Sequence, residues 1–411
     1  MRSILLISYF WPPSGKATVH WPLFISKYLK QYGWRTSVLT VEEDTFSAKD
    51  ETLLKEIDPD TIVVKTKSND PFRLYRRFIG KKEDESLVAS ETISNANKNW
   101  RHKFAVWLRM NLFIPDARIG WILSAPRGGE KIITQTNPLV IVTIGPPHST
   151  HIIGLKLSKK YKIPFIPVLI DPWVDIAYYR GFKRSRLTLA IDNHLERSVM
   201  DSADRIIFVT NDTRNHYCLK YPEIEKKSFV LYWGYNEEYF QSVSKIPQDE
   251  EVILHAGNIF DFQNPVHFWE SVHKEIQKGR KLRLRFAGTV GPGIRQAIDN
   301  AGLSPYTEIL GFLPYSEVVQ EMVNASYLLV CATEKRHVPG KLFEYMRTGN
   351  RIIAFGDDNE EVSQLLQMTN SGKIFPYSYH CNDIFEQLST TSPNPLSALQ
   401  FSREKIAEEF A

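Results

Sequence analysis

The stretch Val338-Pro339-Gly340-Lys341-Leu342-Phe343-Glu344-Tyr345-Met346-Arg347-Thr348-Gly349-Asn350-Arg351 carries the strongest fold signal in the sequence. Pro339 has the fixed φ angle that suits the first turn of a helix, and Gly349 is placed to end that helix. Residues 352–355, Ile-Ile-Ala-Phe, follow at once and have the apolar character of a buried strand. The stretch therefore predicts a loop, a short helix and a strand.

Glu344 is the unusual residue of this helix, because the residues around it are apolar. A carboxylate carried into apolar surroundings is unfavourable unless it has a partner. The amides at the helix start, with Lys341 beside them, would form an anion site of the kind that binds phosphates. A phosphate-bearing ligand whose hydroxyls reach Glu344 would satisfy both groups. The alternative is an ordinary core helix in which Glu344 pairs with a neighbouring arginine.

Length and composition limit the class of protein. The 411 residues exceed the size at which single cores stop growing, so two domains are expected. Hydrophobic content of 43% and charged content of 24% are ordinary for a globular protein. With 51 Lys and Arg against 47 Asp and Glu, the net charge of +4 is too small to indicate a nucleic-acid partner. Cys218, Cys331 and Cys381 form no metal-binding pattern, which favours a reducing compartment without structural zinc.

The sequence also bears on location. Residues 1–9 hold a short apolar run that meets Trp11 rather than a cleavage site, which predicts a buried strand and not a signal peptide. No stretch reaches the about 18 uncharged apolar residues of a membrane span. We expect a cytoplasmic protein, with peripheral contact to the inner face of the cytoplasmic membrane left open. Residues 100–113 mix aromatic and basic side chains as interfacial helices do, with a packed helix as the alternative because the basic residues do not share one face.

The first half opens with a strand, a helix and a second strand. The turn after the strand at residues 4–8 holds Gly15 and Lys16, and a single glycine is not a dinucleotide-binding fingerprint. Later apolar runs, residues 140–144 and 165–170, end in turns that contain His148 and Asp171. Because open parallel sheets bind ligands at the carboxyl ends of their strands, these turns are expected to face a ligand. A solvated loop is the alternative for Gly15, Lys16 and His148.

A polar link near residues 242–251 separates this half from a second run of strands and helices. The pattern predicts an α/β protein of two Rossmann-like, doubly wound parallel-sheet domains that face a cleft. The expected boundaries are 1–241 for the first domain and 242–395 for the second. Residues 396–411 are expected to form a helix that packs back on the first domain.

The order of these pieces resembles the retaining glycosyltransferases of family 4, which have two Rossmann-like domains (the GT-B type), in the branch that makes cell-surface polysaccharides. The segments that carry the resemblance are residues 9–15, 171–173, 203–207, 233–240 and 338–349. It implies transfer of a sugar from a nucleoside-diphosphate sugar to a glycan or lipid-linked acceptor. No cofactor is implied beyond that donor substrate.

The resemblance also implies site residues. The helix at 339–348 would present amides to the diphosphate, Glu344 would bond the ribose hydroxyls, and the turn at 311–313 would lie against the base. The implied donor-binding residues are Gly257, Asn258, Gly311, Phe312, Leu313, Arg336, Pro339, Gly340, Lys341, Leu342 and Glu344. The implied acceptor-binding residues, from the first half, are Gly15, Lys16, His148, Asp171 and Trp173.

The sequence departs from the family at several charged positions. Members commonly carry two glutamates with seven residues between them, and here the first position is Arg336, with Glu334 two residues away. Many members place Arg and Lys against the diphosphate where this chain has Asn258 and Gln263. Lys341, Arg336 or Lys335 would then have to supply the positive charge. The usual Asn before Gly234 is Trp233.

The expected mechanism is metal-independent, and most of its barrier would be charge separation as the diphosphate leaves. We expect Lys341 and Arg336 to contact the diphosphate, Glu344 the ribose, and Asp171 to orient or deprotonate the acceptor. Alternatively, Asp171 forms a side-chain turn before Pro172. Two other functions fit the same pattern: a nucleotide-sugar epimerase and a non-catalytic binding protein descended from a transferase.

Overall fold

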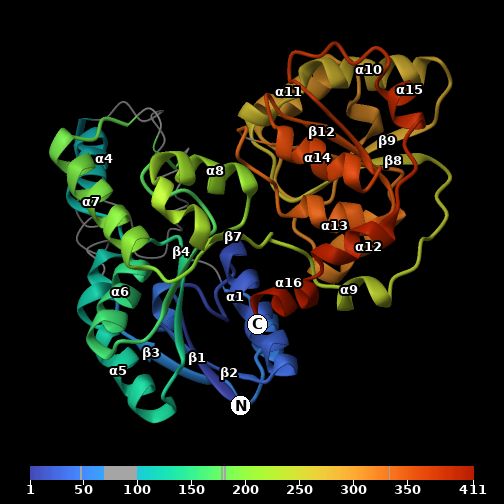
Figure 1. The fold of residues 1–411 in the computed structure, drawn as a ribbon. Coiled ribbons are helices and arrows are strands. Elements are labelled where there is room, and N and C mark those ends of the chain that lie inside the picture. The colour runs from blue at the N-terminus through green and yellow to red at the C-terminus, as the bar shows by residue number, and fades with distance from the viewer. Residues whose placement is uncertain (47–48, 69–99, 177–178, 180–181, 333) are drawn as a thin grey trace. The chain divides into compact units, whose positions relative to one another are not determined.

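A computed structural model describes residues 1–46, 49–68, 100–176, 179, 182–332 and 334–411. The chain divides into two compact units (Figure 1). Unit 1 is Met1–Leu231 together with Ala407–Ala411, and unit 2 is Tyr232–Ile406. Each unit is built on its own parallel sheet.

Unit 1 holds a seven-stranded sheet in the order β3-β2-β1-β4-β5-β6-β7, with every neighbouring pair parallel. Its strands are β1 Arg2–Ser8, β2 Trp34–Val41, β3 Ile62–Thr66, β4 Val140–Gly145, β5 Phe165–Leu169, β6 Ile206–Phe208 and β7 Ser228–Val230. The order changes direction between β1 and β4, so the loops after these two strands meet at the point where open α/β sheets bind ligands.

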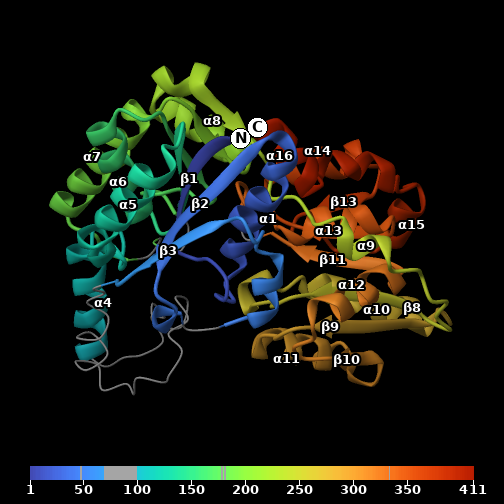
Figure 2. The same cartoon turned by 90° about the horizontal axis from the view of Figure 1, so that it is seen from below.

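Helices cover both faces of the unit 1 sheet, as Figure 2 shows for α1 against α5 and α6. The helices named here are α1 His20–Leu29, α4 Trp100–Leu112, α5 Ala125–Thr136, α6 Ser149–Tyr161, α7 Arg186–Ser202 and α8 Asn211–Lys220. Alternate residues of β1 reflect this: Leu5 and Ile7 join the core under α5 to α8, while Ile4 and Leu6 are buried outside that cluster. A strand buried on both faces is what a parallel sheet requires.

The C-terminal residues belong to unit 1. Helix α16 (Arg403–Phe410) ends with Phe410, whose ring packs edge-on against Trp21 at 6.2 Å between centroids. The indole N–H of Trp34 donates to the carbonyl of Ala411 at 3.3 Å. The last residues of the chain thus fold against the first helix and second strand.

Unit 2 holds a six-stranded parallel sheet in the order β10-β9-β8-β11-β12-β13. Its strands are β8 Glu251–Ala256, β9 Leu282–Ala287, β10 Thr307–Ile309, β11 Tyr327–Cys331, β12 Arg351–Phe355 and β13 Gly372–Phe375. Its helices are α9 Glu238–Gln241, α10 Val266–Gln277, α11 Pro292–Asn300, α12 Tyr315–Asn324, α13 Lys341–Thr348, α14 Glu360–Met368 and α15 Ile384–Ser389. One core lies under α12, α13 and α14, and the other lies under α10, α11 and α15 (Figure 1).

Two doubly wound parallel sheets confirm the predicted α/β class. The helix predicted to begin at Pro339 begins instead at Lys341. The amides of Leu342 and Phe343 donate to the carbonyls of Pro339 and Gly340, at 2.9 and 3.3 Å, in bonds between residues three apart. The first turn is therefore tighter than an α-helix, and it already uses two of the amides expected to be available to an anion. Gly349 ends the helix as predicted, in the left-handed conformation at φ +73°.

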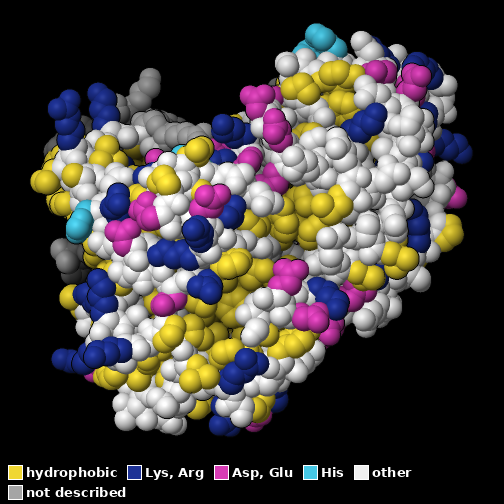
Figure 3. Space-filling model, viewed as in Figure 1, with side chains coloured by type: hydrophobic (Ala, Val, Ile, Leu, Met, Phe, Trp, Pro, Cys, Tyr) yellow, Lys and Arg dark blue, Asp and Glu magenta, His cyan; other side chains and the backbone are white. Residues whose placement is uncertain are grey.

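Among the described residues, no helix is both long enough and apolar enough to cross a membrane. The segment expected to be interfacial or packed is helix α4, in which Phe104 and Trp107 stand 45% and 47% exposed with their rings stacked at 6.2 Å. The side chains of residues 100–103 and 105 lie outside the described part. On the face drawn in Figure 3, Lys and Arg side chains are interspersed with Asp and Glu.

Candidate functional site

Lys341 stands at the change of direction in the unit 2 sheet. Strands β8 and β11 are neighbours there, and α13 begins with Lys341 after the loop that follows β11. The Lys341 ammonium lies 3.1 Å from Nε2 of His255 in β8, and Nδ1 of the same ring lies 3.0 Å from the carbonyl of Leu329. Nε2 also lies 3.4 Å from the carbonyl of Asn258. The two shorter contacts are both satisfied when Nδ1 carries the proton and donates to Leu329, and Nε2 accepts from the ammonium. Burial and the charge of Lys341 hold the pKa of His255 well below its usual value, which keeps the ring neutral.

The ammonium of Lys341 is unusually easy to deprotonate. Burial lowers its pKa to about 8. Burial, with the charge of Lys341, likewise lowers the pKa of His337 to about 4. Gly257, at the end of β8, has φ +94°, and a Cβ there would stand 3.1 Å from the ammonium. A glycine at this place leaves room beside the charge.

Glu344 follows Lys341 by three residues, so both side chains lie on one face of α13. Its Oε1 accepts a hydrogen bond of 2.6 Å from the hydroxyl of Tyr315. Burial raises the pKa of Glu344, while the Tyr315 hydroxyl and the charges of Arg403 and Lys341 act in the opposite direction. The carboxylate therefore has a tyrosine as a protein partner and an arginine charge nearby.

Two contacts fix α13 on the sheet. The hydroxyl of Tyr345 accepts a 2.8 Å hydrogen bond from the amide of Ala256, the last residue of β8. Gly340, directly before the helix, lies so close to Trp233 that a Cβ there would stand 2.8 Å from the indole ring. The tryptophan that replaces the usual asparagine thus sits against the start of the candidate donor helix.

The positions that depart from the family pattern have internal partners. Gln263 is 7% exposed; its amide donates to the carbonyl of Cys331 at 2.8 Å and accepts from the amide of Phe260 at 3.1 Å. Asn258 accepts from the amide of Thr289 at 3.0 Å. Gln263 therefore ties the loop after β8 to the end of β11.

Arg336 is buried and lies 3.6 Å from Glu334, so these two residues form an ion pair in the loop before α13. The turn after β10 contains Gly311 at φ +69°, Phe312, which is 95% exposed, and Leu313, which packs against the core. Exposed Phe312 offers an aromatic face, whereas Arg336 already has a carboxylate beside it.

In unit 1 the loop after β1 is buried from Trp11 to Ser14, and it becomes accessible at Gly15 and Lys16. Gly15 is exposed and Lys16 is half-buried. Asp171 follows β5 and is half-buried; the residue before it, Ile170, donates its amide to Gly145 at the end of β4 at 2.9 Å. Gly15, Lys16 and Asp171, three of the five predicted acceptor positions, thus lie in the loops after β1 and β5, the two strands that flank β4.

His148 and Trp173 stack on each other, with ring centroids 5.0 Å apart and planes at 6°. They are 4% and 1% exposed. Burial lowers the pKa of His148 to about 3, so its imidazole is neutral at physiological pH. Both rings are used in packing, and little of their surface is left for an acceptor.

Within the described ranges, no group of three or more His, Cys, Asp or Glu side chains is arranged to hold a metal ion. Lys341 and Glu344 on one helix turn, at the carboxyl edge of a parallel sheet, are instead suited to a ligand that carries both phosphate and hydroxyl groups.

Residues 250–378 match the family model "Glycosyl transferases group 1". The matched stretch begins beside β8 and ends after β13, so it contains the whole sheet of unit 2 and the Lys341–Glu344 turn. The similarity to this family model therefore spans the sheet of unit 2 and leaves unit 1 unmatched. No curated protein sequence matches the chain.

Solved structures share the fold over almost the full chain. A glycosyltransferase from Rickettsia africae ESF-5 aligns with a TM-score of 0.60 at 14% identity, covering 100% of this chain and 96% of its own. Anabaena Alr3699/HepE, in complex with UDP, aligns with a TM-score of 0.61 at 12% identity, covering 100% and 98%. A UDP-N-acetylglucosamine 2-epimerase aligns with a TM-score of 0.51 at 10% identity, covering 99% and 94%. At these identities the likeness shows the GT-B fold alone.

Four residues of these sites were not singled out from the sequence. His255 and Tyr315 contact Lys341 and Glu344 across 86 and 29 residues of chain, and no local pattern marks such pairs. Asp192 and Glu196 of α7 accept hydrogen bonds from the indole of Trp173 and the amide of Val174, and they do leave a signal in the sequence. They are one helical turn apart on the same face of α7 as buried Val199. Acidic residues at positions of a helix where apolar residues are expected indicate buried, paired carboxylates.

Proposed function

We propose that the protein transfers a sugar from a nucleoside-diphosphate sugar to an acceptor hydroxyl. The observation that carries the proposal is the placement of Lys341 and Glu344 three residues apart within the group 1 domain. A diphosphate leaving group gains negative charge in the transition state, and a pre-placed ammonium stabilises that charge. The Glu344 carboxylate accepts hydrogen bonds from the ribose hydroxyls, and Phe312 offers a face to the base.

Uridine diphosphate is the first nucleotide to test. Structures of Anabaena Alr3699/HepE contain UDP, in one case with glucose, and their GT-B fold spans this chain. The acceptor in this proposal is a lipid-linked or polysaccharide precursor at the inner face of the cytoplasmic membrane, and the transfer retains the anomeric configuration without a metal ion. The resemblance to family 4 supports these finer points, and the exposed Phe104 and Trp107 support membrane contact.

A donor screen tests the proposal. Thermal unfolding is measured with UDP-glucose, UDP-galactose, UDP-N-acetylglucosamine and GDP-mannose, since a ligand bound to the native state raises the apparent stability. Release of nucleotide is then followed with and without a lipid-linked acceptor. Glu344→Ala should abolish turnover and keep the fold, and Glu386→Ala, at an exposed acid of α15, is the matched control. Turnover that is unchanged in Glu344→Ala would remove the central assignment.

Two other functions make different predictions in the same assay. An epimerase, favoured by the UDP-N-acetylglucosamine 2-epimerase that shares the fold, would convert a free nucleotide sugar with no acceptor present. A non-catalytic binding protein is favoured by the internal contacts of Gln263 and Arg336. It would bind nucleotide and release no product under any condition.

A further inference from the structure

The Glu196 carboxylate of α7 is fully buried and accepts four hydrogen bonds. Its Oε2 accepts from the amide of Val174 at 3.1 Å and from the hydroxyl of Tyr217 at 2.8 Å. Its Oε1 accepts from the hydroxyl of Tyr221 at 2.8 Å and from the ammonium of Lys220 at 2.5 Å. A buried carboxylate is tolerated only when its lone pairs are satisfied, and here they are.

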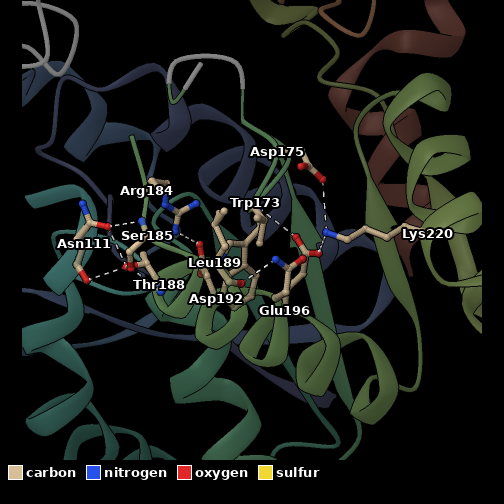
Figure 4. Close-up of polar contacts among 12 residues, drawn as sticks. Asn111, Trp173, Asp175, Arg184, Ser185, Thr188, Leu189, Asp192, Glu196 and Lys220 are labelled. Atoms are coloured by element: carbon tan, nitrogen blue, oxygen red, sulfur yellow. Dashed lines mark hydrogen bonds and ion pairs between the residues drawn. The ribbon is translucent and has the colours of Figure 1, made fainter. Parts of the chain in front are cut away.

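Asp192, one helical turn earlier on α7, is also fully buried. Its Oδ1 accepts from the indole N–H of Trp173 at 2.8 Å, and its Oδ2 pairs with Arg184. The backbone amide of Trp173 donates to Tyr217 at 2.8 Å, and Tyr217 in turn donates to Glu196. Figure 4 shows Asp192 and Glu196 pointing from α7 toward Trp173, with Lys220 reaching Glu196 from the other side.

The same network reaches the end of the loop. Asp175 lies 3.4 Å from the Lys220 ammonium and 3.3 Å from His216. The hydrogen bond from His216 and the charge of Lys220 lower the pKa of Asp175 to about 2, so it stays ionised. Three consecutive residues, 173 to 175, are thus tied to α7 and α8 by directed polar contacts, directly after Asp171. Hydrogen bonds to charged groups fix direction as well as distance, which apolar packing of the same loop would not do.

We propose that Glu196 and Asp192 are positioning residues, which hold residues 171–175 so that Asp171 meets the acceptor hydroxyl in a productive orientation. This inference rests on the proposed function. In this proposal the carboxylates of Glu196 and Asp192 do not contact the substrate. They act through Trp173 and Val174. Their effect is therefore on the acceptor side, and donor binding in unit 2 is independent of them.

The test compares Glu196→Gln and Asp192→Asn with Glu223→Gln. Glu223 is an exposed acid that pairs with Arg197 of α7, the helix that carries Glu196, so it is the matched control. The amide in Glu196→Gln keeps the size of the side chain but turns an N–H₂ group toward donors that need an acceptor. UDP-induced thermal shift reports donor binding, release of UDP from UDP-glucose reports turnover, and hydrogen exchange reports the amides of Trp173 and Val174. Kinetics are measured well below the unfolding temperature of each variant.

We expect Glu196→Gln and Asp192→Asn to lose about ten- to a hundredfold in kcat, as small misplacements of catalytic groups do. The KM for UDP-glucose and the UDP shift should stay unchanged, and the two amides should exchange faster. Glu223→Gln should behave as wild type in every assay. A variant that is less stable but keeps wild-type kcat would overturn the inference, because the network would then be structural only.

A wild type that binds UDP and turns over no donor would instead contradict the proposed function. The positioning claim is then judged by exchange alone, and unchanged protection of the Trp173 and Val174 amides in Glu196→Gln would contradict it. If Glu196→Gln alone fails to fold, the Lys220→Met, Glu196→Gln double variant is measured in its place. It removes the ammonium that Glu196→Gln leaves with Asp175 as its remaining carboxylate partner. By this inference the loop of the double variant folds, but kcat is not restored.

Discussion

Buried charged groups near the carboxyl edges of the two sheets differ in how many hydrogen-bond partners they have. In unit 1, Glu196 accepts four hydrogen bonds, two from tyrosines. In unit 2, the described contacts give the Lys341 ammonium one partner, the neutral ring of His255, and give Glu344 one hydrogen bond from Tyr315. A saturated charge has no bonding capacity left for a ligand, whereas a sparsely bonded one does. The number of partners per buried charge thus separates groups that hold the fold from groups that face a ligand.

Lys341→Met gives the largest expected effect on binding. Removing the ammonium should weaken UDP binding by about 2–3 kcal/mol, the scale of a hydrogen bond to a charged group. It should leave the stability of the protein unchanged or raised, because a costly buried charge is lost. Isothermal titration and thermal unfolding measure the two quantities. Lys278→Met, at a 68% exposed side chain, is the control. Lower stability in Lys341→Met would place this lysine with the groups that hold the fold.

Trp173→Phe in unit 1 should have the opposite effect, lowering stability without changing UDP binding. It removes the indole donor to Asp192 and leaves a buried carboxylate oxygen short of a partner. We expect a loss of about 1–3 kcal/mol in the free energy of unfolding and no change in UDP affinity. The same substitution at half-exposed Trp107 should cost little. If Trp173→Phe weakens UDP binding, then the loop after β5 in unit 1 affects the nucleotide site in unit 2, and the division into fold-holding and ligand-facing groups is wrong.

A pH titration tests the ammonium without changing its neighbours. The pKa of Lys341 lies at about 8 in the folded chain, below the usual value of 10.5, so the group is charged below pH 8 and loses its charge as the pH rises. UDP affinity should therefore fall about tenfold or less between pH 7 and pH 9, since one pKa unit corresponds to 1.36 kcal/mol. In Lys341→Met the affinity should be flat over this range. A wild-type affinity that rises with pH would contradict the assignment.

Tyr315→Phe is expected to have the smallest effect. Without the hydroxyl, Glu344 has to be ordered when the ligand binds, and UDP affinity should drop by about 1 kcal/mol. Tyr306→Phe, on the other core of unit 2, should have no effect on binding. Tighter binding in Tyr315→Phe would mean that the tyrosine competes with the ligand for the carboxylate.

Most of the fold could be predicted because its signals are local. Apolar runs such as residues 352–355 mark strands buried on both faces, and Gly349 marks the end of α13. The start of that helix was placed two residues early. Proline fixes its own φ, but the hydrogen bonds of the first turn, from Leu342 and Phe343, decide where the α-helix begins.

The candidate sites could be predicted only in part. Lys341 and Glu344 are visible because they are neighbours on one helix. Their partners His255 and Tyr315 come from other elements, and only the strand order of the sheet brings them near. The network behind Asp171 was missed for a different reason. Trp173 is expected from the sequence to contact an acceptor, and its bond to Asp192 becomes visible only when α7 is packed against its loop.

The contact between Gly340 and Trp233 links two positions that are far apart in the sequence. A Cβ at residue 340 would stand 2.8 Å from the indole, so Gly340→Ala requires the Trp233 ring or the start of α13 to shift. With a smaller residue at 233, that restriction disappears. A substitution at Gly340 therefore depends on which residue occupies position 233. Engineering of the start of α13 has to begin with Trp233, which lies outside the helix and outside residues 250–378 that match the group 1 family.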